Sequence, residues 1–91
     1  MEEKILTKHP LGKNGKNINK QTYDLFKDTL LKILRNKELT HAELMQHIEL
    51  KLKDKFPGNI SWYAETVKLD LEARKFIERT NLKPQKYRLK Q

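Results

Sequence analysis

The stretch that decides the fold is residues 61–91, with the sequence SWYAETVKLDLEARKFIERTNLKPQKYRLKQ. Up to about Arg74, its apolar residues recur every three or four positions, which is the period of a helix. From Phe76 onward the period changes to two, so that Tyr87 and Leu89 alternate with basic residues as they do in a strand. We therefore expect a helix followed by a β-hairpin. The predicted strands are residues 76–80 and 85–90.

Two further helices are predicted upstream of this segment. The first begins with Asn19 as its N-cap and runs to about Asn36. The second follows residues 40–43, which have the capping-box form, and ends at Phe56-Pro57-Gly58 because proline cannot continue a helix. The third helix begins at Ser61, its predicted N-cap. The residues expected to face the core are Tyr23, Phe26, Leu30, Ile33, Leu34, Leu44, Ile48, Leu52, Ala64, Val67 and Leu71.

The N-terminal segment has no helical pattern. Residues 4–7 are predicted to form a short extended arm, and residues 8–19 a loop with a turn at Asn14-Gly15. We therefore divide the chain into a basic arm and loop at residues 1–18 and one domain at residues 19–91.

The order of these elements is typical of one fold. Three helices followed by a basic hairpin, with Leu39 placed to add a short third strand, predict an α+β winged helix-turn-helix, in which the helices pack with a small antiparallel wing. The sequences LTHAEL (39–44), SWYAETVKLDLEAR (61–74) and FIER (76–79) resemble the winged-helix superfamily of small prokaryotic DNA-binding domains. They are most similar to a group of short bacterial proteins of unassigned function. In related winged helices glycine often follows the third helix, whereas Lys75 occupies that place here.

The composition favours a polyanionic partner. The 91 residues include 20 Lys+Arg and 12 Asp+Glu, which gives a formal net charge of +8, and no cysteine. The positive excess lies at the two ends, +3 in residues 1–20 and +4 in residues 76–91. The absence of cysteine excludes a disulfide scaffold, and the longest apolar runs are too short for a membrane span. We expect a single soluble, cytoplasmic domain with no membrane association; lysines that only maintain solubility are the alternative explanation.

The resemblance implies that the third helix enters the major groove of DNA while the hairpin lies along the phosphates. Lys86, Arg88 and Lys90 alternate along one strand, so their side chains form a row of cations on one face. The alternative is an edge strand that lysines protect from pairing with other chains. The expected phosphate contacts are Lys83, Lys86 and Arg88, extended by Lys13 and Lys16, and the expected groove contacts are Tyr63, Thr66 and Lys68. This pattern predicts a non-enzymatic protein that binds double-stranded DNA and regulates transcription.

A second apolar stripe on the third helix indicates an alternative function. Trp62, Leu69 and Ala73 lie opposite the core-facing residues, and residues 58–75 carry no net charge. Either the N-terminal arm covers this stripe, or a second copy of the chain or another protein binds it. The alternative is therefore a protein–protein interaction module or a homodimer. RNA binding ranks lower, because the sequence shows no aromatic platform on which bases would stack.

No catalytic or metal site is predicted. Glu43 and His47 stand four residues apart on one helix face, but a catalytic zinc normally needs three protein ligands. Residues 12–17 lack the spacing of a phosphate-binding loop, and Ser61, the only serine, is expected to cap a helix. We expect no cofactor and no small-molecule substrate.

Overall fold

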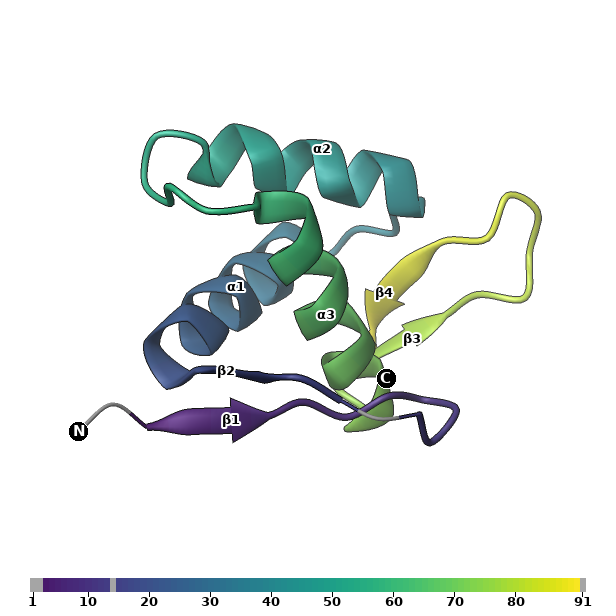
Figure 1. Cartoon of the computed structure of the whole chain (residues 1–91). Helices are drawn as coiled ribbons and strands as arrows, with labels where there is room; N and C mark the ends of the chain where they lie inside the picture. Colours follow the sequence, from purple (N-terminus) through teal and green to yellow (C-terminus); the bar gives the residue numbers. More distant parts are fainter. Residues whose placement is uncertain (1–2, 14, 91) are drawn as a thin grey trace.

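The computed structural model describes residues 3–13 and 15–90 and shows three helices and two antiparallel hairpins, which confirms the predicted α+β class (Figure 1). The elements are β1 (Lys4–Leu6), β2 (Asn17–Asn19), α1 (Lys20–Ile33), α2 (His41–Leu52), α3 (Ile60–Ala73), β3 (Ile77–Arg79) and β4 (Tyr87–Leu89). Each helix packs against the other two. No helix in the described part of the chain is long and apolar enough to cross a membrane.

Two of the three predicted helix starts are confirmed. Asn19 caps α1 by accepting hydrogen bonds from the N–H groups of the following residues. Thr40 and Glu43 form the capping box of α2, each side chain accepting from the backbone N–H of the other. The predicted cap of α3 was wrong, because Asn59 rather than Ser61 accepts the N–H of Trp62, at 3.0 Å. Asparagine caps as well as serine does, and the earlier start includes the buried Ile60 in the first turn.

Lys75 has a specific role in the hydrogen bonding that ends α3. The N–H of Phe76 donates to the carbonyl of Leu71 at 2.9 Å, and the N–H of Lys75 to that of Glu72 at 3.1 Å. This bond pair is the Schellman motif, which requires a left-handed residue just beyond the helix. Lys75 takes that conformation with a φ of 70°. It therefore adopts the backbone geometry that glycine commonly provides just beyond the end of a helix.

The core consists of the residues predicted to face inward. All eleven are buried, and Phe26 at the centre is completely inaccessible. Its ring lies 5.0 Å from that of Phe56, edge to face, and 5.7 Å from that of Tyr63, stacked. Ile18 and Tyr87 add buried side chains from the two hairpins. Because each fully buried large apolar side chain contributes about 1.5–3 kcal/mol, this shared core holds the helices and both hairpins together.

The N-terminal hairpin, formed by β1 and β2, was not predicted. Residues 17–19 were expected to belong to a loop, but they pair with β1 so that Ile5 lies opposite Ile18. Only one buried residue, Ile18, marks β2, so the segment shows no alternation from which a strand could be recognised. β2 also spans the boundary placed between the arm and the domain. The predicted turn includes Asn14, which lies outside the described residues.

Gly15 allows the two sides of the N-terminal hairpin to approach closely. A Cβ atom at this position would stand 1.6 Å from the carbonyl oxygen of Thr7, so no larger residue fits without movement of the backbone. The N–H of Thr7 donates to the carbonyl of Lys16 at 2.9 Å, and the N–H of Lys16 donates to the hydroxyl of Thr7 at 2.8 Å. These bonds fix the place of Lys16 relative to the strands.

The C-terminal hairpin, formed by β3 and β4, confirms the predicted strand pair in shorter form. Glu78 lies opposite Arg88, and Tyr87 lies opposite Arg79. Leu39 and Tyr87 exchange two backbone hydrogen bonds of 3.1 and 2.7 Å, so the predicted third strand is present as a single bridge. Figure 1 shows the loop of this hairpin projecting away from the helices.

A buried carboxylate joins the N-terminal hairpin to two helices. Asp70 of α3 is completely inaccessible. It accepts hydrogen bonds from the hydroxyl of Tyr23 on α1, from the backbone N–H of Lys8 at 2.8 Å, and from Nε of Arg74 at 2.9 and 3.0 Å. Burial and the hydrogen bond to Asp70 raise the pKa of Tyr23 above its usual range, so this phenol stays a donor. The charge of Asp70 is thus fully compensated inside the fold.

Replacing Asp70 with asparagine should destabilise the protein strongly. An amide cannot accept from all three donors, and a broken buried ion pair costs about 3–5 kcal/mol in the free energy of unfolding. The matched control is Asp24→Asn, which removes the exposed pair between Asp24 and Lys20 and should change stability little. Urea unfolding followed by circular dichroism measures both. Equal effects of the two substitutions would show that Asp70 does not anchor the structure.

Candidate nucleic-acid interface

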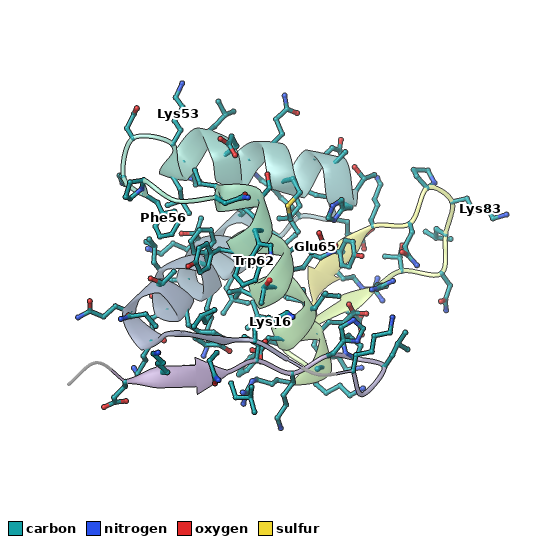
Figure 2. The ribbon with its side chains drawn as sticks, in the orientation of Figure 1. Lys16, Lys53, Phe56, Trp62, Glu65 and Lys83 are labelled. Carbon is teal, nitrogen blue, oxygen red and sulfur yellow. The ribbon has the colours of Figure 1, made fainter. Side chains whose placement is uncertain are left out.

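The loops of the two hairpins project on the same side of α3. Figure 1 shows the loop between β3 and β4 and the loop between β1 and β2 extending in the same direction beyond this helix. Figure 2 shows Lys83 at the tip of the C-terminal hairpin and Lys16 in front of α3. Lys16 lines a small cavity together with Thr66 and Leu69 of α3. The basic residues of the two chain ends therefore lie in loops that project on the same side of one helix.

Lys83 and Lys86 supply the cations of the C-terminal hairpin that have no ion-pair partner among the described residues. Lys83 is exposed, and Lys86 is half buried just before β4. Both were expected to contact phosphates, and their placement is compatible with that role. At the N-terminal hairpin, Lys13 is exposed and lines a pocket with Lys8 and Lys75 at the end of α3.

The predicted row of cations on β4 is partly neutralised within the hairpin. Nε of Arg88 lies 2.7 Å from Glu78, and its terminal nitrogen lies 3.1 Å from Glu38. Nζ of Lys90 lies 3.2 Å from the other oxygen of Glu78. These hydrogen bonds, chiefly that from Arg88, lower the pKa of Glu78, so its carboxylate stays charged. Arg88 is therefore held by two carboxylates and is not a free phosphate ligand as it stands.

Lys68 does not lie on the surface of α3, so the prediction that it contacts the groove was wrong. Only 3% of the residue is exposed. Its ammonium donates to the hydroxyl of Tyr87 at 3.1 Å and lies 3.0 Å from Nδ1 of His41. The residue faces inward because it stands four positions after Ala64 and three before Leu71, in phase with the core stripe.

The outward side of α3 carries Trp62, Glu65 and Thr66. Figure 2 shows Trp62 and Glu65 on the side of this helix that faces the viewer. Glu65 is exposed and Thr66 is half buried. Tyr63, another expected groove contact, is half buried because its ring packs between the aromatic rings of Phe26 and Phe56. Of the three predicted groove contacts, Thr66 is thus the one whose position beside Lys16 fits the role best.

The second apolar stripe of α3 is not one continuous exposed surface. Leu69 and Ala73 are half buried, and each lines a pocket whose other wall is the N-terminal hairpin and its loop. Trp62 remains 42% exposed, with its ring 4.9 Å from that of Tyr63 and nearly perpendicular to it. The N-terminal segment therefore covers part of the stripe, which agrees with the predicted alternative that the N-terminal arm covers it, and leaves Trp62 accessible.

Residues 3–13 and 15–90 hold no group of three or more histidine, aspartate or glutamate residues that could bind a metal ion. Two polar clusters were missed by sequence reasoning, one at Asp70 and one at Lys68. The helical phase of Lys68 was a usable signal, because it shares the spacing of the buried residues of α3. Asp70 had the same phase signal, three positions after Val67, and Arg74 stands four positions after it; its other donors come from α1 and from the chain after β1, which the sequence does not reveal.

Comparison with known proteins gives a family but no activity. A family model described as a family of unknown function, DUF6958, matches residues 4–87. Because the match covers nearly the whole chain, the protein belongs to this family. No curated protein and no solved structure shows significant similarity to it.

Proposed function

We propose that the protein is a winged helix-turn-helix that binds double-stranded DNA without catalysing a reaction, as a regulator of transcription. The order of elements supports this fold: α1, the bridging residue Leu39, α2, α3 and then the β3–β4 hairpin. Tyr87 of β4 pairs with Leu39 on one side and with Arg79 of β3 on the other, which gives β4 the central place in a minimal three-stranded sheet. In this proposal the C-terminal hairpin is the wing.

The observation that carries the proposal is the pair of basic loops that project in the same direction beyond α3 (Figure 1). Lys16 lies in front of α3, and Lys83 lies at the tip of the C-terminal hairpin, which projects beyond this helix (Figure 2). A DNA duplex presents one negative charge per about 1.7 Å of its axis, so lysines in two loops next to one helix can meet several phosphates of the backbone. The major groove, about 12 Å wide, admits one α-helix.

We assign different roles in DNA binding to α3 and to the hairpin loops on the basis of their charges. The exposed face of α3 carries Glu65 and no free lysine among its described residues, so this helix adds little attraction for phosphates. A carboxylate in the groove accepts a hydrogen bond from the amino group of cytosine, and a hydroxyl such as that of Thr66 serves several bases. We assign affinity to Lys13, Lys16, Lys83 and Lys86 in the two hairpin loops, and base discrimination to α3.

Trp62 supports a second candidate function. A large aromatic residue that is 42% exposed is a frequent anchor of protein interfaces. Because the N-terminal hairpin leaves this side chain accessible, a second copy of the chain or another protein has an anchor on α3. This candidate is a homodimer or interaction module centred on Trp62, with Leu69 and Ala73 contributing only at its edge.

The salt dependence of DNA binding tests the first candidate. Replacing Lys16 and Lys83 with alanine should lower the magnitude of the slope of log K against log salt by about 2, since each lost phosphate contact accounts for about 0.9. The control replaces Lys51 and Lys53, exposed residues at the far end of α2, and should leave the slope nearly unchanged (Figure 2). Fluorescence anisotropy with random duplex DNA measures the slope for both variants. An equal decrease of the slope in the two variants would show that the hairpin loops do not contact the DNA.

Glu78→Gln should strengthen DNA binding. The substitution removes the carboxylate that holds Arg88 and Lys90, which frees two wing cations for phosphates. The slope should steepen and the affinity should rise. Glu49→Gln on exposed α2 changes the net charge equally and should have a much smaller effect. An affinity no higher in Glu78→Gln than in this control would show that the wing does not face the DNA.

Sedimentation tests the second candidate. If Trp62 anchors a homodimer, the wild-type protein shows concentration-dependent association, and Trp62→Ala loses it because the buried aromatic area is removed. Leu50→Ala, which truncates an exposed apolar residue of α2, should keep the association. A monomer at all concentrations in the wild-type protein would refute self-association through this residue.

A further inference from the structure

Lys68 is a buried cation whose hydrogen-bond partners are neutral. Its Nζ lies 3.0 Å from Nδ1 of His41 and 3.1 Å from the hydroxyl of Tyr87, and 4.2 Å from the centre of the Tyr87 ring. No carboxylate of the described residues lies within ion-pair distance of it. These three side chains, which we call the Lys68 cluster, belong to α3, α2 and β4.

The chemistry of the cluster fixes the protonation state of His41. A lysine ammonium has three donors and no acceptor, so Nδ1 of His41 must offer its lone pair. His41 is therefore neutral, with its proton on Nε2. A proton added at Nδ1 would remove the acceptor and place two positive charges 3.0 Å apart. Acid thus turns an attractive contact into a repulsive one.

The other charges around His41 do not reverse this balance. Burial and the charge of Lys68, in that order, lower the pKa of His41; Glu65 of α3 opposes them and Arg79 of β3 adds to them. Arg79 lies over the Tyr87 ring and pairs with Glu72 at 2.6 Å. The other charged residues of α2 are Glu43, whose carboxylate accepts the N–H of Thr40, and Glu49 and Lys51 further along the helix. On the other elements, Asp70, Glu72, Glu78 and Arg88 are engaged in ion pairs, and Lys86 precedes β4.

Tyr87 couples the cluster to the attachment of the C-terminal hairpin. Its phenol accepts from Lys68, while its backbone exchanges both hydrogen bonds with Leu39. The same residue therefore joins the hairpin to α3 and to the segment before α2. A disturbance at Lys68 is transmitted directly to this attachment.

We propose that the Lys68 cluster is a proton-sensitive latch, in which protonation of His41 loosens the C-terminal hairpin from α2 and α3. The latch does not depend on what the hairpin binds. Because the pKa of His41 is lower in the folded protein than in the unfolded chain, the stabilising contribution is complete above about pH 6.5. This contribution of neutral His41 to the stability of the hairpin attachment is lost as the pH falls through the pKa that His41 has in the folded protein.

Amide hydrogen exchange of the hairpin tests the latch. The reporters are the N–H groups of Leu39, Tyr87 and Thr80, which bond across the hairpin and its bridge. Corrected for intrinsic exchange, their protection should fall between pH 7.5 and pH 5.5, by at most about tenfold per pH unit. Core amides of α1 should keep their protection. Unchanged protection at the reporters would overturn the proposal.

Two substitutions distinguish the effect of His41 protonation from other effects of low pH on the protein. His41→Asn keeps an oxygen acceptor that does not titrate, and Lys68→Met keeps the length of the side chain without its charge. His41→Asn should abolish the pH dependence of the reporters, and Lys68→Met should reduce it, because burial of His41 contributes as well. His47→Asn, a control at a half-buried position on the same helix, should retain it. A pH dependence that survives in His41→Asn would refute the role of this imidazole.

A measurement on the wild-type protein covers the case in which a variant does not fold. NMR of the His41 ring should show the Nε2–H tautomer at pH 7.5 and a titration midpoint below 6.5. The Nδ1–H tautomer, or a midpoint at or above 6.5, would overturn the proposal.

Discussion

The carboxylate of Asp70 is the point on which the arrangement of the molecule depends. It is fully buried, and its donors come from α1, from the segment that follows β1 and from the end of α3 itself. A two-stranded hairpin is marginal in water by itself, so the N-terminal hairpin needs this anchor together with the burial of Ile18. Without the docked hairpin, Lys16 would not lie beside α3.

The arginines of the C-terminal half and the lysines of the two hairpin loops have different roles. Arg74, Arg79 and Arg88 each pair with a carboxylate, in agreement with the planar, multiple-donor geometry of guanidinium. The lysines at the loop tips, Lys13 and Lys83, remain exposed. The net charge therefore overstates the number of cations available to a partner, because much of the positive charge on β3 and β4 is paired with carboxylates of the same chain.

The helices could be predicted from the sequence because capping residues and apolar spacing act locally. The capping box at Thr40 and the inner face of α1 are examples of such short-range signals. The pairing of Glu78 with Arg88 was not predictable, because it depends on the register of two strands joined by a seven-residue loop, residues 80–86. β2 escaped prediction because its pairing with β1 and its packing on α1, rather than its own composition, make it a strand.

For the candidate site, the sequence correctly indicated that a basic hairpin follows α3. It did not reveal which cations are already paired. Lys68 was read as a groove residue because it is charged, although its phase on α3 matched that of Val67 and Leu71. Where helical phase and residue polarity disagree, the structure shows phase to be the better guide to direction at this position.

Lys75 shows a compromise between backbone relaxation and charge. Its left-handed conformation costs a non-glycine residue about 1 kcal/mol, which glycine would avoid. Yet Lys75 lines the same pocket as Lys8 and Lys13, at the junction of α3 and the N-terminal loop. A glycine at this position would relieve the strained dihedral angle, but it would also make the local electrostatic potential less positive. Thermostability and the positive potential therefore cannot both be maximised at this position.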